Sequence, residues 1–186
     1  MVRTRRGVVG KGLLSAFALV AVAGLFTVPQ VAVLPIGLPG LPFHLRLDAL
    51  SAFFLFLLGS AGAGISIFAS GYFRKGEGTP PGLLCLLYHL FVASMAMVMV
   101  ADDAYVFMVM WELMALSSFF LVTANHMIPA IRRAGYLYLL VAHIGALGIL
   151  LAFGVLQANT GDYTFANMRA QQLSPFWAST AFLLAL

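Results

Sequence analysis

Long stretches without a charged side chain dominate this sequence and restrict the folds that it can adopt. Asp, Glu, Lys and Arg are absent from residues 12–45, 49–73, 78–101, 113–131, 134–161 and 170–186. A helix needs about 20 consecutive apolar residues to cross the hydrocarbon core of a bilayer. Charged residues make up 9% of the chain, whereas about a quarter is usual in soluble domains. Together with a mean hydropathy of +1.01, this pattern predicts an integral membrane protein.

We predict an all-α fold, a polytopic bundle of about six transmembrane helices that forms a single transmembrane domain over residues 1–186. The predicted helices cover residues 12–33, 48–72, 82–101, 104–123, 134–157 and 174–186. Proline and glycine gather in residues 34–47 and 76–82, which are therefore predicted to be loops. Asp102 and Asp103 make the connection between the third and fourth helices very short, so these helices should form a hairpin. The last helix is too short to cross the bilayer and is expected to be truncated.

The distribution of basic residues predicts the orientation of the bundle. With the N-terminus in the cytoplasm, eight Lys and Arg residues fall on the cytoplasmic side, and two, Arg46 and Arg169, fall on the other side. Such a bias follows the positive-inside rule. We therefore expect a multi-pass protein of the cell inner (plasma) membrane with a cytoplasmic N-terminus. The first segment has a second interpretation, because a basic start with Arg5 and Arg6 before an apolar stretch is also typical of a cleaved signal peptide.

Glu112 is the single charged residue in the middle of a predicted span, within the stretch VFMVMWELMALSSFFLV. A charged side chain at the bilayer centre costs about 2.5–3.5 kcal/mol on insertion scales, and residues of this kind are usually functional. Its neighbours along the helix include Met108, Ala115 and Leu116, which cannot stabilise a carboxylate. The protonated form is therefore favoured unless a cation from another helix faces Glu112. We predict that Glu112 takes part in proton translocation; the alternative is a structural carboxyl that makes one interhelical hydrogen bond.

His143 lies in the middle of the next predicted helix, and Arg132 and Tyr136 lie on the same face. At 100° per residue, the three positions fall within about 40° of one another. They form a polar stripe from the cytoplasmic end to the middle of the membrane, and an imidazole can exchange protons near neutral pH. We predict that His143 joins Glu112 in proton translocation, with Tyr136 and Arg132 as candidate members of the path. The alternative for His143 is a core histidine that is bonded to a backbone carbonyl.

Several other classes of function have no comparable support. The basic residues are scattered between apolar runs, so the net charge of +4 does not indicate a nucleic-acid partner. The single cysteine, Cys85, excludes a disulfide framework, and no Cys/His spacing resembles a zinc site. The small residues of segment 59–71 lie inside an apolar run and are predicted to pack helices together. We expect no cofactor, no metal and no catalytic residue of an enzyme.

Four stretches of the chain resemble a known group of membrane proteins. They are LRLDALSAFFLFLLGSAGAGISIFASGYF, LFVASMAMVMVADDAYVFMVMWELMALSSFFLV, RRAGYLYLLVAHIGALGILLAF and LSPFWASTAFLLAL. In this order they resemble the antiporter-like proton-translocating membrane subunits of respiratory complex I and the group 4 hydrogenases. The resemblance covers residues 45–186 and is greatest for the large membrane subunit of the hydrogenase-4 and formate hydrogenlyase type.

This resemblance implies a larger fold with two inverted helical repeats, in which buried Lys, Glu and His residues carry protons. The essential glutamate of the family corresponds to Glu112, and the histidine of the following helix corresponds to His143. The lysine that usually faces this glutamate would follow Leu186. The chain is therefore expected to be an N-terminal fragment whose C-terminal helices are missing.

Three functions follow from the resemblance. The first is a proton-translocating subunit of a hydrogenase-4 or NADH:quinone oxidoreductase-like complex, without a redox centre of its own. The second is a subunit of a multisubunit Na⁺/H⁺ antiporter, and the third is a non-transporting piece that serves assembly. The expected partners are other membrane subunits, the lipid bilayer, and protons or Na⁺.

Overall fold

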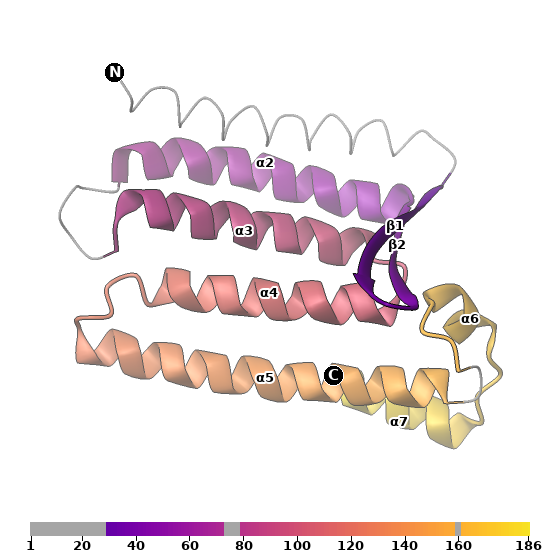
Figure 1. Ribbon diagram of the computed structural model, residues 1–186. Coiled ribbons are helices and arrows are strands. Elements are labelled where there is room, and N and C mark those ends of the chain that lie inside the picture. Colours follow the sequence, from indigo (N-terminus) through magenta and orange to yellow (C-terminus); the bar gives the residue numbers. More distant parts are fainter. Residues whose placement is uncertain (1–28, 73–78, 159–160) are drawn as a thin grey trace.

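The computed structural model describes residues 29–72, 79–158 and 161–186, and these form a helical membrane bundle. Along the chain the elements are β1 (Gln30–Leu38), β2 (Leu41–Leu47), α2 (Ala49–Tyr72), α3 (Pro81–Val100), α4 (Ala104–Val122), α5 (Pro129–Gln157), α6 (Phe165–Ala170) and α7 (Pro175–Ala185). The helices α2 to α5 lie side by side in chain order, and the hairpin and α6 lie at one end of the bundle (Figure 1). Within the described ranges, four helices are long and apolar enough to cross a membrane: α2, α3, α4 and α5.

The predicted helices agree with the structure except near residues 30–47, at the start of α5 and at α6, which was not predicted. Helices α2, α3, α4 and α7 begin and end within two residues of the predicted bounds, and α7 is short, with 11 residues. Helix α5 has 29 residues and begins at Pro129 rather than at residue 134, because arginines are tolerated in its first turns. Residues 30–33 were predicted to end the first helix, but they lie in β1. The rest of that predicted helix, over residues 12–28, lies outside the described residues.

The segment predicted to be a loop is an antiparallel β-hairpin. Strands β1 and β2 pair from Gln30 opposite Leu47 to Leu38 opposite Leu41, with a register shift between Leu34 and Gly37. Gly37 has a φ of +130°, and a β-carbon at this position would collide with the carbonyl oxygen of Leu41. The proline and glycine residues therefore form the turn and the irregular register of a hairpin rather than an open loop.

Small side chains lie where the helices meet. The buried residues of the spans include Ala52, Ala96, Ala115, Ala146, Ala152, Ser94 and Ser117. Small residues allow helix backbones to approach closely when lipid, rather than water, surrounds the bundle. Segment 59–71 follows this rule, because Gly62 is buried and its carbonyl accepts a hydrogen bond of 3.2 Å from the Tyr88 hydroxyl of α3.

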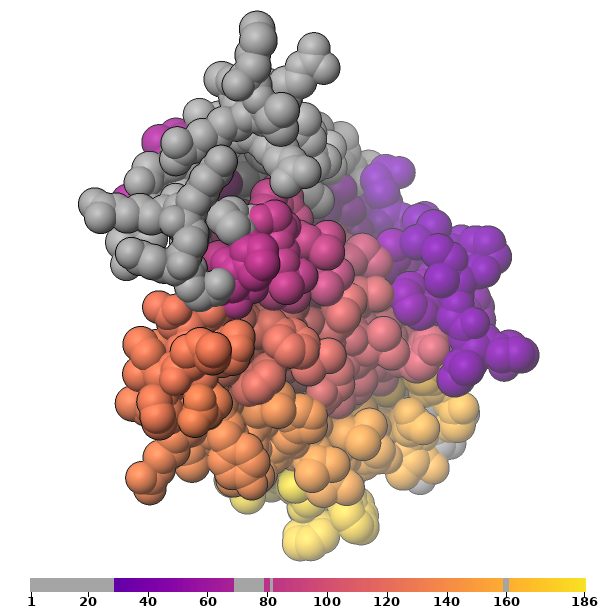
Figure 2. Space-filling view, turned by 60° about the vertical axis from the view of Figure 1, so that its left-hand side comes forward, coloured from indigo at the N-terminus to yellow at the C-terminus, as the bar shows by residue number. Residues whose placement is uncertain are grey.

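Large apolar side chains cover the outer faces of the long helices. Phe68 of α2, Val141 of α5 and Phe182 of α7 are each about two-thirds exposed, at 67%, 66% and 66%. In the space-filling view, α3 (magenta) lies above α4 and α5 (orange), and α7 (yellow) lies below them (Figure 2). Apolar surface of this extent suits contact with lipid or with neighbouring membrane subunits rather than with water.

Candidate functional site

The position of Glu112 in the membrane follows from the start of α4. Asp103 is the N-cap of this helix, and its Oδ1 atom accepts a hydrogen bond of 2.6 Å from the backbone N–H of Val106. A capping carboxylate satisfies a free N–H group of the first turn and fixes where the helix begins. Helix α4 then continues to Val122, so that Glu112 lies near its midpoint.

Glu112 of α4 faces His143 of α5, a contact that the sequence analysis did not predict. The Oε2 atom of Glu112 lies 3.5 Å from the Nε2 atom of His143. This distance is within ion-pair range, but it exceeds the roughly 2.7–3.2 Å of a typical hydrogen bond. The side chains are 42% and 52% exposed, respectively, so both remain open to further groups.

The other ring nitrogen of His143 determines how this pair can hold a proton. Nδ1 lies 2.8 Å from the carbonyl oxygen of Leu139, which can only accept, so Nδ1 carries a hydrogen atom. In the neutral imidazole, Nε2 is then an acceptor that faces the carboxyl group. The contact is favourable when one proton lies between the two groups, either on the Glu112 carboxyl or on the His143 imidazole. Without that proton, the lone pairs of Nε2 and the carboxylate would face each other.

The pair lines an apolar cavity of about 520 Å³ between α4 and α5. The remaining lining residues are Met108, Val109, Ala146, Leu147 and Leu150. Because these five side chains offer no hydrogen bond to a charge, an ionised carboxylate here depends on His143 or on a cation from elsewhere. The cavity therefore places one carboxyl group in apolar surroundings, with His143 as the one other polar side chain in its lining.

An aromatic cluster separates this cavity from the hairpin end of the bundle. Phe107 stacks on Trp111 with ring centroids 5.6 Å apart, and it contacts Phe153 edge to face at 5.4 Å. Phe165 of α6 completes the cluster, 5.5 Å from Phe153. These packed rings provide no chain of hydrogen-bonding groups from Glu112 toward the hairpin.

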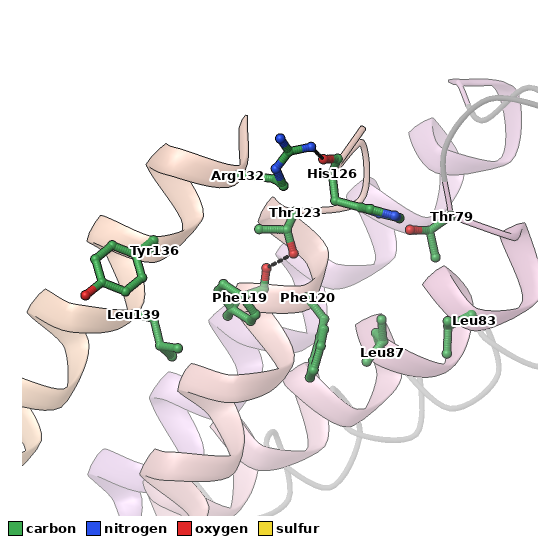
Figure 3. Close-up of a pocket in the computed structure, with 10 residues that line it drawn as sticks. All are labelled: Thr79, Leu83, Leu87, Phe119, Phe120, Thr123, His126, Arg132, Tyr136 and Leu139. Carbon is green, nitrogen blue, oxygen red and sulfur yellow. Dashed lines mark hydrogen bonds between the residues drawn. The ribbon is translucent and has the colours of Figure 1, made fainter. Parts of the chain in front are cut away.

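Arg132 and Tyr136 line a second cavity, nearer the opposite end of the bundle (Figure 3). The guanidinium group of Arg132 donates hydrogen bonds to the carbonyls of His126, at 2.9 Å, and Met127, at 3.4 Å. The structure thus brings Glu112 and His143 together and leaves Arg132 and Tyr136 in a neighbouring space. Leu139 links the two regions, because it lines the second cavity and its carbonyl binds His143.

Sequence reasoning missed a buried polar cluster at the hairpin end. Asp103 is fully buried, and its Oδ2 atom accepts a hydrogen bond of 2.8 Å from the backbone N–H of His44. The backbone N–H of Ala104 donates to the carbonyl of Tyr163, and the Tyr163 hydroxyl donates to the carbonyl of Pro42. The signal in the sequence was the acidic pair before an apolar run, which is typical of a helix N-cap.

The comparison with known proteins places this site in a family. The family model described as "NADH:quinone oxidoreductase/Mrp antiporter, TM" matches residues 101–186, which include Glu112 and His143. This part of the chain belongs to that family. The antiporter-like chain is also 38% identical to hydrogenase-4 component B of Escherichia coli (strain K12) over 141 residues, which are 76% of this chain and 21% of the relative.

Two further matches extend the likeness to antiporter complexes. Na(+)/H(+) antiporter subunit A1 of Staphylococcus aureus (strain bovine RF122 / ET3-1) is 27% identical over 151 residues, 79% of this chain and 19% of the relative. In the solved structure of the Mrp complex from Dietzia sp. DQ12-45-1b, one chain matches with a TM-score of 0.82 and 28% identity, over 98% of this chain and 20% of that chain. The antiporter-like chain spans about a fifth of the length of these relatives. It is a multi-pass, antiporter-like membrane subunit, as the resemblance predicted.

Proposed function

We propose that this chain forms the proton-translocating part of a membrane subunit in a hydrogenase-4 or NADH:quinone oxidoreductase-like complex, where it couples electron transfer to proton movement. The observation that supports this function is the contact between Glu112 and His143, two titratable groups on neighbouring spans. In this proposal the chain holds no redox centre, and the other membrane subunits of the complex are its partners. Its location is the cell inner (plasma) membrane, with the N-terminus in the cytoplasm.

The proposed step is the transfer of one proton between Oε2 of Glu112 and Nε2 of His143. Because Nδ1 is bonded to the carbonyl of Leu139, the imidazole exchanges its proton through Nε2 alone. A cation that approaches Glu112 stabilises the carboxylate, so the proton moves to His143 as an imidazolium. When the cation withdraws, the carboxylate has no polar partner in the cavity lining other than His143, and in this proposal the proton returns to Glu112. The resemblance implies that a lysine from a later helix supplies this cation.

In this proposal the proton reaches the pair from the arginine-bearing end of α5. Tyr136 and Arg132 lie between that end and His143 along the helix and remain candidate members of the path. Water that enters from this end would complete the chain of hydrogen bonds, since polar lines of this kind carry protons through membrane proteins. The aromatic cluster closes the direct line toward the hairpin, so in this proposal the proton leaves the pair sideways, to a neutral proton acceptor on a later helix.

The test uses the complete natural protein in its assembled complex. Proton uptake is measured in inverted vesicles with the electron donor of the complex, at matched subunit levels. Glu112→Gln keeps the size and hydrogen bonding of the side chain but cannot ionise, so it should abolish proton uptake while assembly is unchanged. Glu112→Asp should retain part of the uptake, and His143→Gln should reduce it strongly.

A second histidine provides a matched control for His143→Gln. His89 of α3 makes the same type of contact, with Nδ1 2.7 Å from the carbonyl of Cys85, but it forms no ion pair with a described carboxylate. His89→Gln should therefore leave proton uptake unchanged. Wild-type uptake by Glu112→Gln would show that Glu112 is structural and would favour a role in assembly alone. Equal losses of proton uptake in His143→Gln and His89→Gln would show that His143 has no special role in translocation.

A Na⁺/H⁺ antiporter subunit is the second candidate, supported by the likeness to the Mrp complex and to antiporter subunit A1. The two functions differ in what drives proton movement. Vesicles of an electron-transfer complex acidify on addition of hydrogen, formate or NADH, whereas antiporter vesicles lose a preformed pH gradient on addition of Na⁺. Collapse of the gradient by Na⁺, without any response to an electron donor, would replace the first proposal with the second.

A further inference from the structure

The second cavity, at the start of α5, has an amphipathic lining. Its volume is about 520 Å³, and it lies between α3, α4 and α5. Arg132, His126 and Thr79 gather at the outer rim, and the side chains below them are apolar except for Thr123 and Tyr136, which carry hydroxyl groups (Figure 3). The apolar part is formed by Leu83 and Leu87 of α3, Phe119 and Phe120 of α4, and Leu139 of α5. The cavity thus combines a cationic rim with an apolar interior.

The charges at this end of the bundle are not balanced by the described protein. The guanidinium group of Arg132 meets two backbone carbonyls, and no described carboxylate lies within ion-pair distance of it. The described aspartates, Asp48, Asp102, Asp103 and Asp162, lie near the opposite ends of the spans, and Glu112 lies in the middle of α4. A ligand that fits this rim should therefore carry a negative charge.

The depth of the cavity suits an acyl chain. Arg132 and Leu139 are seven residues apart on α5, which corresponds to about 10 Å along the helix axis. Half of a hydrocarbon core of about 30 Å is about 15 Å, so the cavity would hold the upper part of one acyl chain of a single leaflet. The rim is at the level of the helix ends, where phospholipid headgroups lie.

We propose that this cavity binds one anionic phospholipid, with its phosphate at Arg132 and His126 and one acyl chain between Phe120, Leu87 and Leu139. Basic pockets between transmembrane helices bind acidic headgroups in this way. The site is separate from the Glu112–His143 pair but shares Arg132 and Tyr136 with the proposed proton path, and its test measures lipid selection rather than proton transfer. In this proposal the acyl chain fills the space between α3, α4 and α5 at this end of the bundle.

The occupant is identified by photocrosslinking from inside the cavity. The photoreactive residue p-benzoylphenylalanine replaces Phe120 in the complete protein, in vesicles of phosphatidylcholine and phosphatidylglycerol in equal parts, and the adducts are identified by mass spectrometry. We expect phosphatidylglycerol adducts to exceed phosphatidylcholine adducts severalfold. A second reporter, photoleucine at Leu87, repeats the measurement in case the first variant does not fold. Crosslinks to another protein segment instead of lipid, or equal yields of the two lipids, would overturn the proposal.

Adjacent arginines test whether the cavity, rather than the surface charge, selects the lipid. Arg132 lines the cavity, whereas Arg133, which carries the same charge one position later, does not. Since one basic residue near an anionic headgroup changes binding by about fivefold, Arg132→Gln should remove most of the phosphatidylglycerol preference. Arg133→Gln should leave it unchanged, and Arg132→Lys should retain part of it. The same loss of preference in Arg132→Gln and Arg133→Gln would indicate general surface attraction and would refute a specific site.

Discussion

Asp103 and His44, which are 59 positions apart, are joined by two contacts to the same carboxylate oxygen. Oδ2 of Asp103 lies 2.8 Å from the backbone nitrogen of His44 and 3.1 Å from its ring nitrogen Nδ1. The other oxygen, Oδ1, accepts from the N–H of Val106. One buried carboxylate therefore caps α4 and ties β2 to it, which makes Asp103 a direct connection between the hairpin and the bundle.

Removal of the Asp103 carboxylate should strongly destabilise the chain. Asp103→Ala deletes a helix cap and leaves a buried N–H of the hairpin unpaired, a combined loss of about 2–4 kcal/mol in the free energy of unfolding. Asp102→Asn is the matched control, because Asp102 pairs at 3.7 Å with Arg169, and the two side chains are 14% and 60% exposed, respectively. A long ion pair with one exposed partner contributes about 1 kcal/mol or less. Titration with sodium dodecyl sulfate in mixed micelles would measure the free energy of unfolding of both variants. Equal losses in Asp103→Ala and Asp102→Asn would contradict the structural role of the buried Asp103 carboxylate.

Close packing between α4 and α5 should depend on Gly135. A β-carbon at Gly135 would overlap the γ-methyl group of Thr123 and lie 3.3 Å from the Phe119 ring. Gly135→Ala should therefore destabilise the bundle by about 1–3 kcal/mol through overpacking. The same unfolding titration would measure this loss.

A second substitution and a control identify the cause of that loss. Thr123→Ser removes the methyl group and keeps the hydroxyl that donates to the carbonyl of Phe119, so it should restore part of the stability of Gly135→Ala. Gly145→Ala places a methyl group on the same helix where no heavy atom lies within 4 Å, and it should be neutral or slightly stabilising. If both glycine variants were equally destabilised, packing against Thr123 would not be the reason.

The orientation of the bundle can be tested with single cysteines. Arg132 and Asp162 lie near opposite ends of α5, so they should face opposite sides of the membrane. In a Cys85→Ala background, Arg132→Cys should react in intact cells only with membrane-permeant thiol reagents, because the Lys and Arg count places it in the cytoplasm. Asp162→Cys should react with impermeant reagents from outside. The reverse pattern would invert the predicted topology.

The first turn of α2 should loosen in acid. Oδ1 of Asp48 accepts a hydrogen bond of 2.9 Å from the backbone N–H of Ser51, which holds the pKa of the Asp48 carboxyl below its ordinary value of 3.8, and Arg46 acts in the same direction. Because the folded pKa is the lower one, the stabilisation is present above pH 3.8 and is lost as the pH falls through the folded value. As the pH falls below 3.8, protection of the Ser51 amide from hydrogen exchange should decrease relative to protection of the amide of the buried Ala96. In Asp48→Asn this acid-dependent loss should disappear, and its persistence would rule out Asp48 as the cause.

The positions of the spans could be predicted because each helix must satisfy its own backbone in lipid. That requirement produces long uncharged runs, and the Asp102–Asp103 pair marks the start of α4 to the residue. The hairpin could not be predicted in this way, since its strands are held by backbone pairing, from Leu38 opposite Leu41 to Gln30 opposite Leu47, which a search for uncharged runs does not detect. Helix α6, with six residues, is too short to show a helical period.

The residues of the candidate site could be predicted individually, but their arrangement could not. A mid-span carboxylate was evident from its cost in lipid, and this cost is the reason to expect a partner for Glu112. The sequence did not determine the rotation of α4 against α5, which places His143 beside Glu112 and leaves Tyr136 in another cavity. That rotation depends on the close approach at Gly135, a contact between residues on two helices.

The 29 residues of α5 have a consequence for the bilayer. At 1.5 Å per residue this helix is about 43 Å long, and its uncharged part after Arg133 is about 36 Å long, whereas the 19 residues of α4 reach about 28 Å, close to the thickness of a typical hydrocarbon core. Hydrophobic mismatch of this kind is relieved when the longer helix tilts or the surrounding lipid thickens. Because Glu112 is on the matched helix and His143 is on the mismatched one, a change in acyl-chain length is expected to move the imidazole relative to the carboxyl group. We therefore expect the separation of the pair to depend on membrane thickness.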